Sequence, residues 1–186
     1  MKKQILLASL LSALSFPAMA DGFYILGDIG QSNADYEALD GYSLEKDDTT
    51  YSIGAGFDLN QFASIEVTYR DLGSFNDRGN DGFDSWSDTL SVTALQASIV
   101  GRLPVNDVFN VYGRLGFANI DAELDISDNT GLPDEQESDS KTRGLFGIGA
   151  SYNLTPEFAL NAEYSQYAKW DDLKLSALTV GATYHF

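Results

Sequence analysis

The sequence predicts an all-β fold, an eight-stranded antiparallel transmembrane up-and-down β-barrel, and three observations lead to it. Apolar and polar residues alternate with a period of two along eight segments, which is typical of strands with two unlike faces. Short and long connections alternate between these segments, as they do in barrels whose strands run back and forth across a membrane. Aromatic residues gather near both ends of the segments, where a bilayer has its two interfaces.

The N-terminus has the features of a targeting segment. Two lysines precede a short apolar stretch, and Ala18 and Ala20 form a small-x-small cleavage site, which is typical of a secretory signal peptide. The alternative is a membrane anchor, but the stretch is shorter than the roughly 20 apolar residues that a spanning helix needs. We expect a cleavable signal peptide over residues 1–20 and a barrel domain over residues 21–186, beginning at Asp21.

The first two expected strands cover residues 22–32 and 50–60. In the first, Asp28 belongs on a polar face, which leaves Phe23, Ile25 and Ile29 for the apolar face. The second is cleaner, because apolar residues at odd positions from 51 to 59 alternate with small or polar ones. Six further segments repeat the pattern. Their apolar sets are Ala63, Ile65, Val67 and Tyr69; Leu95, Ala97, Ile99 and Leu103; Phe109, Val111, Leu115 and Phe117; Phe146, Ile148, Ala150, Tyr152 and Leu154; Phe158, Leu160, Ala162 and Tyr164; and Leu178, Val180, Ala182, Tyr184 and Phe186.

The connections fix the number of strands. A spanning strand takes about ten residues, so eight strands use about half of the chain and sixteen would leave almost nothing between them. Tight turns are expected at 60–62, 104–107 and 155–157, and long polar links at 33–49, 71–88, 119–143 and 166–177.

The aromatic residues indicate which face meets lipid. A soluble barrel would place the apolar sets inside, whereas a membrane barrel places them outside. Aromatic rings favour the two membrane interfaces, and a soluble barrel gives no reason to sort them to strand ends. With the first strand running outward, the inner belt is Phe57, Phe109, Tyr152, Phe158, Tyr184 and Phe186, and the outer belt is Tyr51, Tyr69, Phe117, Phe146 and Tyr164.

The polar faces then line the lumen. They carry acidic residues that include Asp28 and Asp58, and every cation among them is arginine, which can bridge carboxylates in a confined space. The candidate lumen ion-pair cluster is Glu66, Arg70, Arg102, Arg114 and Glu163. Because side chains fill the interior of eight-stranded barrels, we interpret it as a structural plug; the alternative is a gate for ions or small solutes.

Taken together, the expected signal peptide, the eight alternating strands and the ending from Leu178 to Phe186 resemble the small outer-membrane β-barrel surface proteins, a group that includes OmpX-like and Opa-like proteins and the membrane domain of OmpA. The resemblance covers essentially the whole mature chain. It implies a bacterial outer-membrane location, contact with lipopolysaccharide, and a C-terminal signal read by the barrel-assembly machinery. The residues that match this signal are Val180, Ala182, Tyr184 and Phe186.

The long links concentrate the negative charge. They hold 21 of the 28 acidic residues, so we expect either a solvated, repulsive surface or a site for divalent cations, cationic host molecules or cationic peptides. The acids of the third link are Asp121, Glu123, Asp125, Asp128, Asp134, Glu135, Glu137 and Asp139. A pI near 4.1 excludes sequence-independent nucleic-acid binding.

One link contains a weak calcium candidate. Asp77, Asp81 and Asp88 stand at the first, fifth and twelfth positions of a segment with Gly82 at the sixth, as in a calcium loop. The third-position ligand and the final glutamate are missing, so a turn-rich loop without metal is the preferred interpretation. No cofactor is expected, and the absence of cysteine excludes disulfides and thiol chemistry.

Catalysis is the third alternative, because some outer-membrane barrels modify lipid A. The single histidine, His185, is penultimate and at the periplasmic end, so no serine on the outer side has an imidazole to activate it. We therefore expect a monomeric, non-enzymatic surface protein, structural or adhesin-like, with a narrow pore as the alternative. Trp86 and Trp170 fall in the long links, as rim anchors or contact residues.

Overall fold

The computed structural model describes residues 22–37, 43–80, 85–128, 135–168 and 173–186. They form a closed barrel in which each strand pairs with its sequence neighbours and the first pairs with the last. The strands are β1 (Phe23–Glu37), β2 (Ser43–Asn60), β3 (Ala63–Asn80), β4 (Ser85–Pro104), β5 (Phe109–Asp128), β6 (Glu135–Asn153), β7 (Phe158–Tyr167) and β8 (Leu173–His185).

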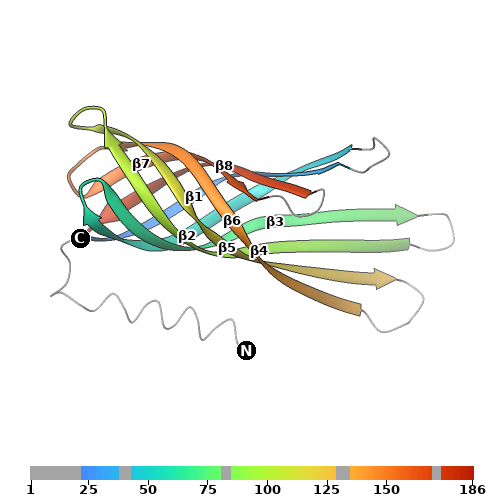
Figure 1. Ribbon diagram of the computed structural model, residues 1–186. Coiled ribbons are helices and arrows are strands. Elements are labelled where there is room, and N and C mark those ends of the chain that lie inside the picture. Colours follow the sequence, from blue (N-terminus) through green and yellow to red (C-terminus); the bar gives the residue numbers. More distant parts are fainter. Residues whose placement is uncertain (1–21, 38–42, 81–84, 129–134, 169–172) are drawn as a thin grey trace.

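All neighbouring strands are antiparallel, which confirms the predicted fold class. The barrel closes between β1 and β8, where Ile25 lies opposite Tyr184. The turns that follow β2, β4 and β6 are as short as expected. Figure 1 shows these turns and the C-terminus at one end of the barrel. The described residues contain no helix long and apolar enough to cross a membrane.

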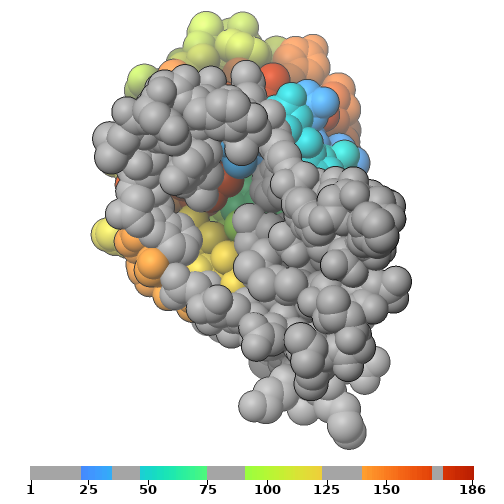
Figure 2. Space-filling view, turned by 90° about the vertical axis from the view of Figure 1, so that its right-hand side faces the viewer, coloured from blue at the N-terminus to red at the C-terminus, as the bar shows by residue number. Residues whose placement is uncertain are grey.

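The strands extend well beyond the expected ranges. Most of what the sequence indicated as long polar links is strand, and β4 and β5 each have 20 residues. Figure 1 shows β3 to β6 projecting past β7 and β8 on the side opposite the tight turns, and Figure 2 looks onto that end. The prediction of long links was therefore wrong. Polar segments were interpreted as links, but backbone pairing between neighbouring strands continues through them on the extracellular side.

Residue exposure along β4 shows where the membrane ends. Near its middle, Leu95 and Ile99 are exposed while Gln96 is buried, as expected for a wall that faces lipid. Further toward the extracellular end, the apolar residues Ala94 and Val92 are buried instead. The two-residue period continues, but the apolar face has changed from outside to inside.

The same change occurs in β5. Leu115 and Phe117 are exposed and Arg114 is buried, whereas Ala118 and Ile120, further along, are buried apolar residues. On the periplasmic side of this level, β4 and β5 expose apolar residues and bury polar ones, as in a membrane barrel. On the extracellular side they bury apolar residues, as in a water-soluble barrel. The outer aromatic belt lies just below the change, which places the outer membrane surface there.

A β-bulge in β3, in its pairing with β4, lies at the level where β3 parts from β2. Their pairing ends with Tyr51 opposite Asp71, and the β3–β4 register shifts between Asp71 and Gly73. Gly73 has a φ of 102°, a conformation that side chains disfavour. Asp71 Oδ1 accepts the Gly73 amide and Asp48 Oδ2 accepts the Ser74 amide. These bonds hold the bulge, above which β3 leaves the β1–β2 hairpin.

Candidate functional site in the barrel lumen

Arg114 is the centre of the charged lumen. It is 7% exposed and lies between Glu66 and Glu163, which are buried to a similar degree. Its Nη1 is 2.6 Å from Glu66 Oε2, and its Nε donates to both oxygens of Glu163 at 3.0 and 3.1 Å. Nη1 also donates to Ser98 Oγ at 2.9 Å. One guanidinium thus joins β3, β4, β5 and β7 across the lumen, which satisfies charges that would be costly if unpaired.

Tyr24 extends this network toward the periplasm, and the sequence analysis did not assign it a role. Its fully buried hydroxyl donates to Glu66 Oε1 at 2.7 Å and accepts from Arg102 Nη2 at 3.0 Å. The Arg102 guanidinium lies 5.3 Å from the centre of the same ring. Its inward position could have been recognised from the sequence. Tyr24 and Asp28 are four residues apart in the same strand, and residues an even number apart face the same side.

Glycine makes room for the Tyr24 ring. Gly56 lies directly opposite Tyr24 in the β1–β2 register, and a Cβ at Gly56 would be 2.2 Å from the ring. The ring therefore occupies the space above a bare backbone, as aromatic residues do across from strand glycines.

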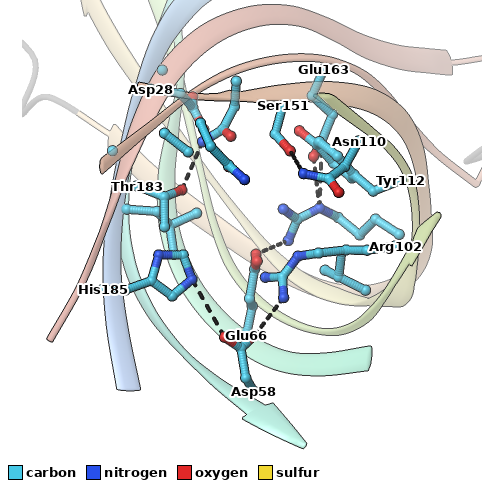
Figure 3. A pocket seen from close by; sticks show the side chains of 18 of the residues that line it. Asp28, Asp58, Glu66, Arg102, Asn110, Tyr112, Ser151, Glu163, Thr183 and His185 are labelled. Atoms are coloured by element: carbon cyan, nitrogen blue, oxygen red, sulfur yellow. Dashed lines mark hydrogen bonds and ion pairs between the residues drawn. The ribbon is translucent and has the colours of Figure 1, made fainter. Parts of the chain in front are cut away.

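The other two predicted arginines each pair with an aspartate, and Arg102 is connected to the Glu66 network through Tyr24. Arg102 pairs with Asp58, and His185 Nε2 lies 3.4 Å from the other Asp58 oxygen. Arg70 does not join the Glu66 network; its Nη2 lies 2.9 Å from Asp28 Oδ2. The five residues expected as one cluster thus occupy three levels of the lumen. Figure 3 shows Glu66 and Glu163 of one level, Asp58 and Arg102 of another, and Asp28 of the third.

A polar cavity of about 330 Å³ runs between these levels. Its lining reaches from Gln61 and Pro156 in the periplasmic turns, past Arg114, to Asp28. Figure 3 shows Glu66, Arg102 and Glu163 directed into it. The arrangement can hold water and neutralise buried charge. Among the described residues, no group of His, Asp or Glu has the geometry of a metal site.

The remaining predicted residues lie elsewhere. Ala18 and Ala20 fall outside the described residues, as do Asp81 and Trp170. Asp77 and Asp88 lie opposite each other in the β3–β4 hairpin, so the backbone there is paired strand and not the twelve-residue loop expected. Trp86 likewise lies in β4. Val180, Ala182, Tyr184 and Phe186 stand at the C-terminal end, with the Tyr184 and Phe186 rings 5.2 Å apart at their centres.

A closed barrel with an exposed apolar wall, two aromatic belts and an ion-paired interior defines an integral membrane protein of the bacterial outer membrane. The chain belongs to the outer membrane protein beta-barrel domain family, whose model matches residues 5–186. This membership confirms the location and family expected from the sequence.

The relatives extend over the full length. The attachment invasion locus proteins of Yersinia pseudotuberculosis serotype I (strain IP32953) and Yersinia enterocolitica are each 26% identical to this chain, over all of it and 98% and 100% of their own lengths. Among solved structures, Yersinia pestis Ail in complex with the heparin analogue sucrose octasulfate matches with a TM-score of 0.60 and 22% identity, covering 89% of this chain and 99% of Ail. Neisserial surface protein A matches with a TM-score of 0.65 and 19% identity, covering 89% and 97%.

Proposed function

We propose that this chain is a non-enzymatic outer-membrane surface protein that attaches to a cationic partner through its extracellular end. The observation that carries the proposal is the sheet of β3 to β6, which continues past the end of β7. The full-length relatives named for attachment and invasion support the same role.

The projecting sheet offers a strand edge. The β6–β7 pairing ends with Leu145 opposite Tyr167, and one further bond joins the Ala168 amide to the Gly144 carbonyl. From Glu135 to Arg143, the described residues of β6 pair only with β5. Because backbone groups alternate in direction along a strand, the N–H and C=O of Ser140 face the same open side as the Gly144 carbonyl. Such an edge can accept an added strand.

Charge selects the partner. The regions 33–49, 71–88, 119–143 and 166–177 hold 21 acidic residues and six of the 11 basic ones, and β6 begins with the alternating acids Glu135, Glu137 and Asp139. A polyanion such as the octasulfate bound by Yersinia pestis Ail would be repelled by such a surface. An extended segment with basic residues at alternate positions would instead be attracted.

Lipid and assembly contacts complete the proposal. The outer aromatic belt lies at the level where lipopolysaccharide head groups begin, and the C-terminal residues from Val180 to Phe186 serve the barrel-assembly machinery. The barrel acts as a monomer, since its strands close on themselves and leave no membrane-embedded edge.

The test uses full-length barrel in lipid vesicles and a fluorescent peptide of alternating Lys and Thr. We expect the peptide to bind and sucrose octasulfate not to bind. Glu135→Gln with Glu137→Gln should weaken binding, whereas the same loss of charge at the periplasmic turns, Asp107→Asn with Glu157→Gln, should not. Ser140→Pro removes an edge donor, and it should weaken binding relative to Ser140→Ala. Equal binding by all variants would contradict the proposal.

A further inference from the structure

The lumen changes character along its axis. The charged levels give way, toward the extracellular end, to a cluster that we call the apolar plug: Leu72, Val92, Ala94, Ala118, Ile120, Leu145, Tyr167 and Leu175. Each member is at most 6% exposed. The plug lies above the level of the polarity change described for β4 and β5, inside the part of the barrel that resembles a water-soluble protein.

The plug draws residues from most strands of the barrel. Its members come from β3, β4, β5, β6, β7 and β8, and Ala34 of β1 packs against it. The small polar side chains beside the plug are hydrogen-bonded to backbone carbonyls of β3. Ser32 Oγ donates to the Leu72 carbonyl at 2.6 Å, and Thr50 Oγ1 donates to the Asp71 carbonyl at 2.5 Å. The lower boundary is Tyr167, whose hydroxyl accepts from Gln96 Nε2 at 2.6 Å. Apart from this hydroxyl, which is already bonded to Gln96, the plug side chains carry no polar group that could replace an ion's water.

The charged levels, in contrast, leave room. The cavity of about 330 Å³ passes the Arg114 network on its way from the periplasmic turns to Asp28. A cavity needs only about 10–15 Å³ of such space to hold a water molecule, so this one holds several. An ion on this path keeps polar neighbours throughout, and the network that the sequence indicated as a possible gate does not fill the lumen.

We propose that the apolar plug, and not the Glu66–Arg114–Glu163 network, is the permeability barrier, so that the lumen is a water-filled vestibule open only to the periplasm. An ion entering the plug would lose its hydration without compensation. An ion beside Arg114 and its carboxylates would not. This inference concerns the inside of the barrel and stands apart from the proposed attachment at its outside.

Planar-bilayer recordings of the full-length barrel compare two matched pairs of substitutions. Leu72→Ser with Tyr167→Ser shortens two fully buried plug residues and should produce discrete conductance steps. Glu66→Gln with Glu163→Gln keeps the size of each side chain and one acceptor oxygen on each but removes the charge, and it should stay silent like the wild type. Steps in the wild type, steps only in the glutamine pair, or silence of a folded serine pair would each overturn the proposal. Folding is checked by the heat-dependent shift in SDS electrophoresis.

A second measurement leaves the plug intact. The chain has no cysteine, so Asn161→Cys places a single thiol in the vestibule lining. In vesicles of known orientation, a charged, membrane-impermeant thiol reagent should modify it from the periplasmic side and not from the extracellular side. Modification from both sides, or from neither, would overturn the proposal even if the serine pair failed to fold.

Discussion

The Tyr24→Phe substitution tests whether the lumen network stabilises the barrel. It removes one hydroxyl and keeps the ring over Gly56, so the packing is unchanged. The lost contacts are the bond to Glu66 at 2.7 Å, the bond from Arg102 at 3.0 Å and the contact with Ser64 Oγ at 2.9 Å. A hydrogen bond to a charged group contributes about 1.5–3 kcal/mol, and water from the adjacent cavity replaces part of it, so we expect the free energy of unfolding to fall by about 2–4 kcal/mol.

The assay is equilibrium urea unfolding in lipid vesicles, followed by fluorescence of the two tryptophans and by the electrophoretic heat shift. The matched control is Tyr164→Phe, which removes a hydroxyl from a lipid-facing ring of the outer belt. A double-mutant cycle with Glu66→Gln should give a coupling energy of about 0.5–3 kcal/mol. If Tyr24→Phe and Tyr164→Phe lie within about 0.5 kcal/mol of each other, the hydroxyl is not a stabilising link and the reasoning is refuted.

Three other predictions follow from the sequence and the structure. Gly73→Ala should lower the free energy of unfolding by about 1–3 kcal/mol, because a side chain is strained at positive φ. The control is Gly144→Ala, which has no positive φ and should change the free energy of unfolding less. Arg114→Met should cost about 3–5 kcal/mol by leaving Glu66 and Glu163 buried and unpaired; stability that rises when both glutamates are also changed to glutamine would identify this cause, and no rise would exclude it. N-terminal sequencing of the mature protein should begin at Asp21, and retention of the first residues would contradict a cleavable signal peptide.

The membrane-embedded half of the fold was open to prediction from the sequence. Lipid on one side and a narrow polar lumen on the other impose opposite polarity on successive residues, so every spanning strand shows the same pattern. The inward position of Glu66, Arg70, Arg102, Arg114 and Glu163 followed from this alternation alone. Their division among three levels of the lumen did not, because it depends on which strands lie opposite one another across the lumen.

The extension of the strands on the extracellular side was not predicted, and the reason is again the polarity of successive residues. In β5 the apolar residues change from odd positions at Leu115 and Phe117 to even positions at Ala118 and Ile120, and a search for one continuous apolar face ends there. The alternation of apolar and polar residues continued, but the sequence does not show whether the apolar face meets lipid outside the barrel or the core inside it. Tyr24 was missed similarly, since a tyrosine near a strand end is equally suited to a membrane interface.

Local periodicity and composition were enough to predict the number of strands, their direction, the lipid-facing wall and the negative charge of the extracellular end. The length of the strands, the carboxylate that each arginine meets and the level at which the lumen is closed depend on contacts between strands and were not open to prediction from the sequence. Those features arise where residues distant in the chain come together: the apolar plug combines residues from 72 to 175, and no local pattern shows that they share one cross-section of the barrel.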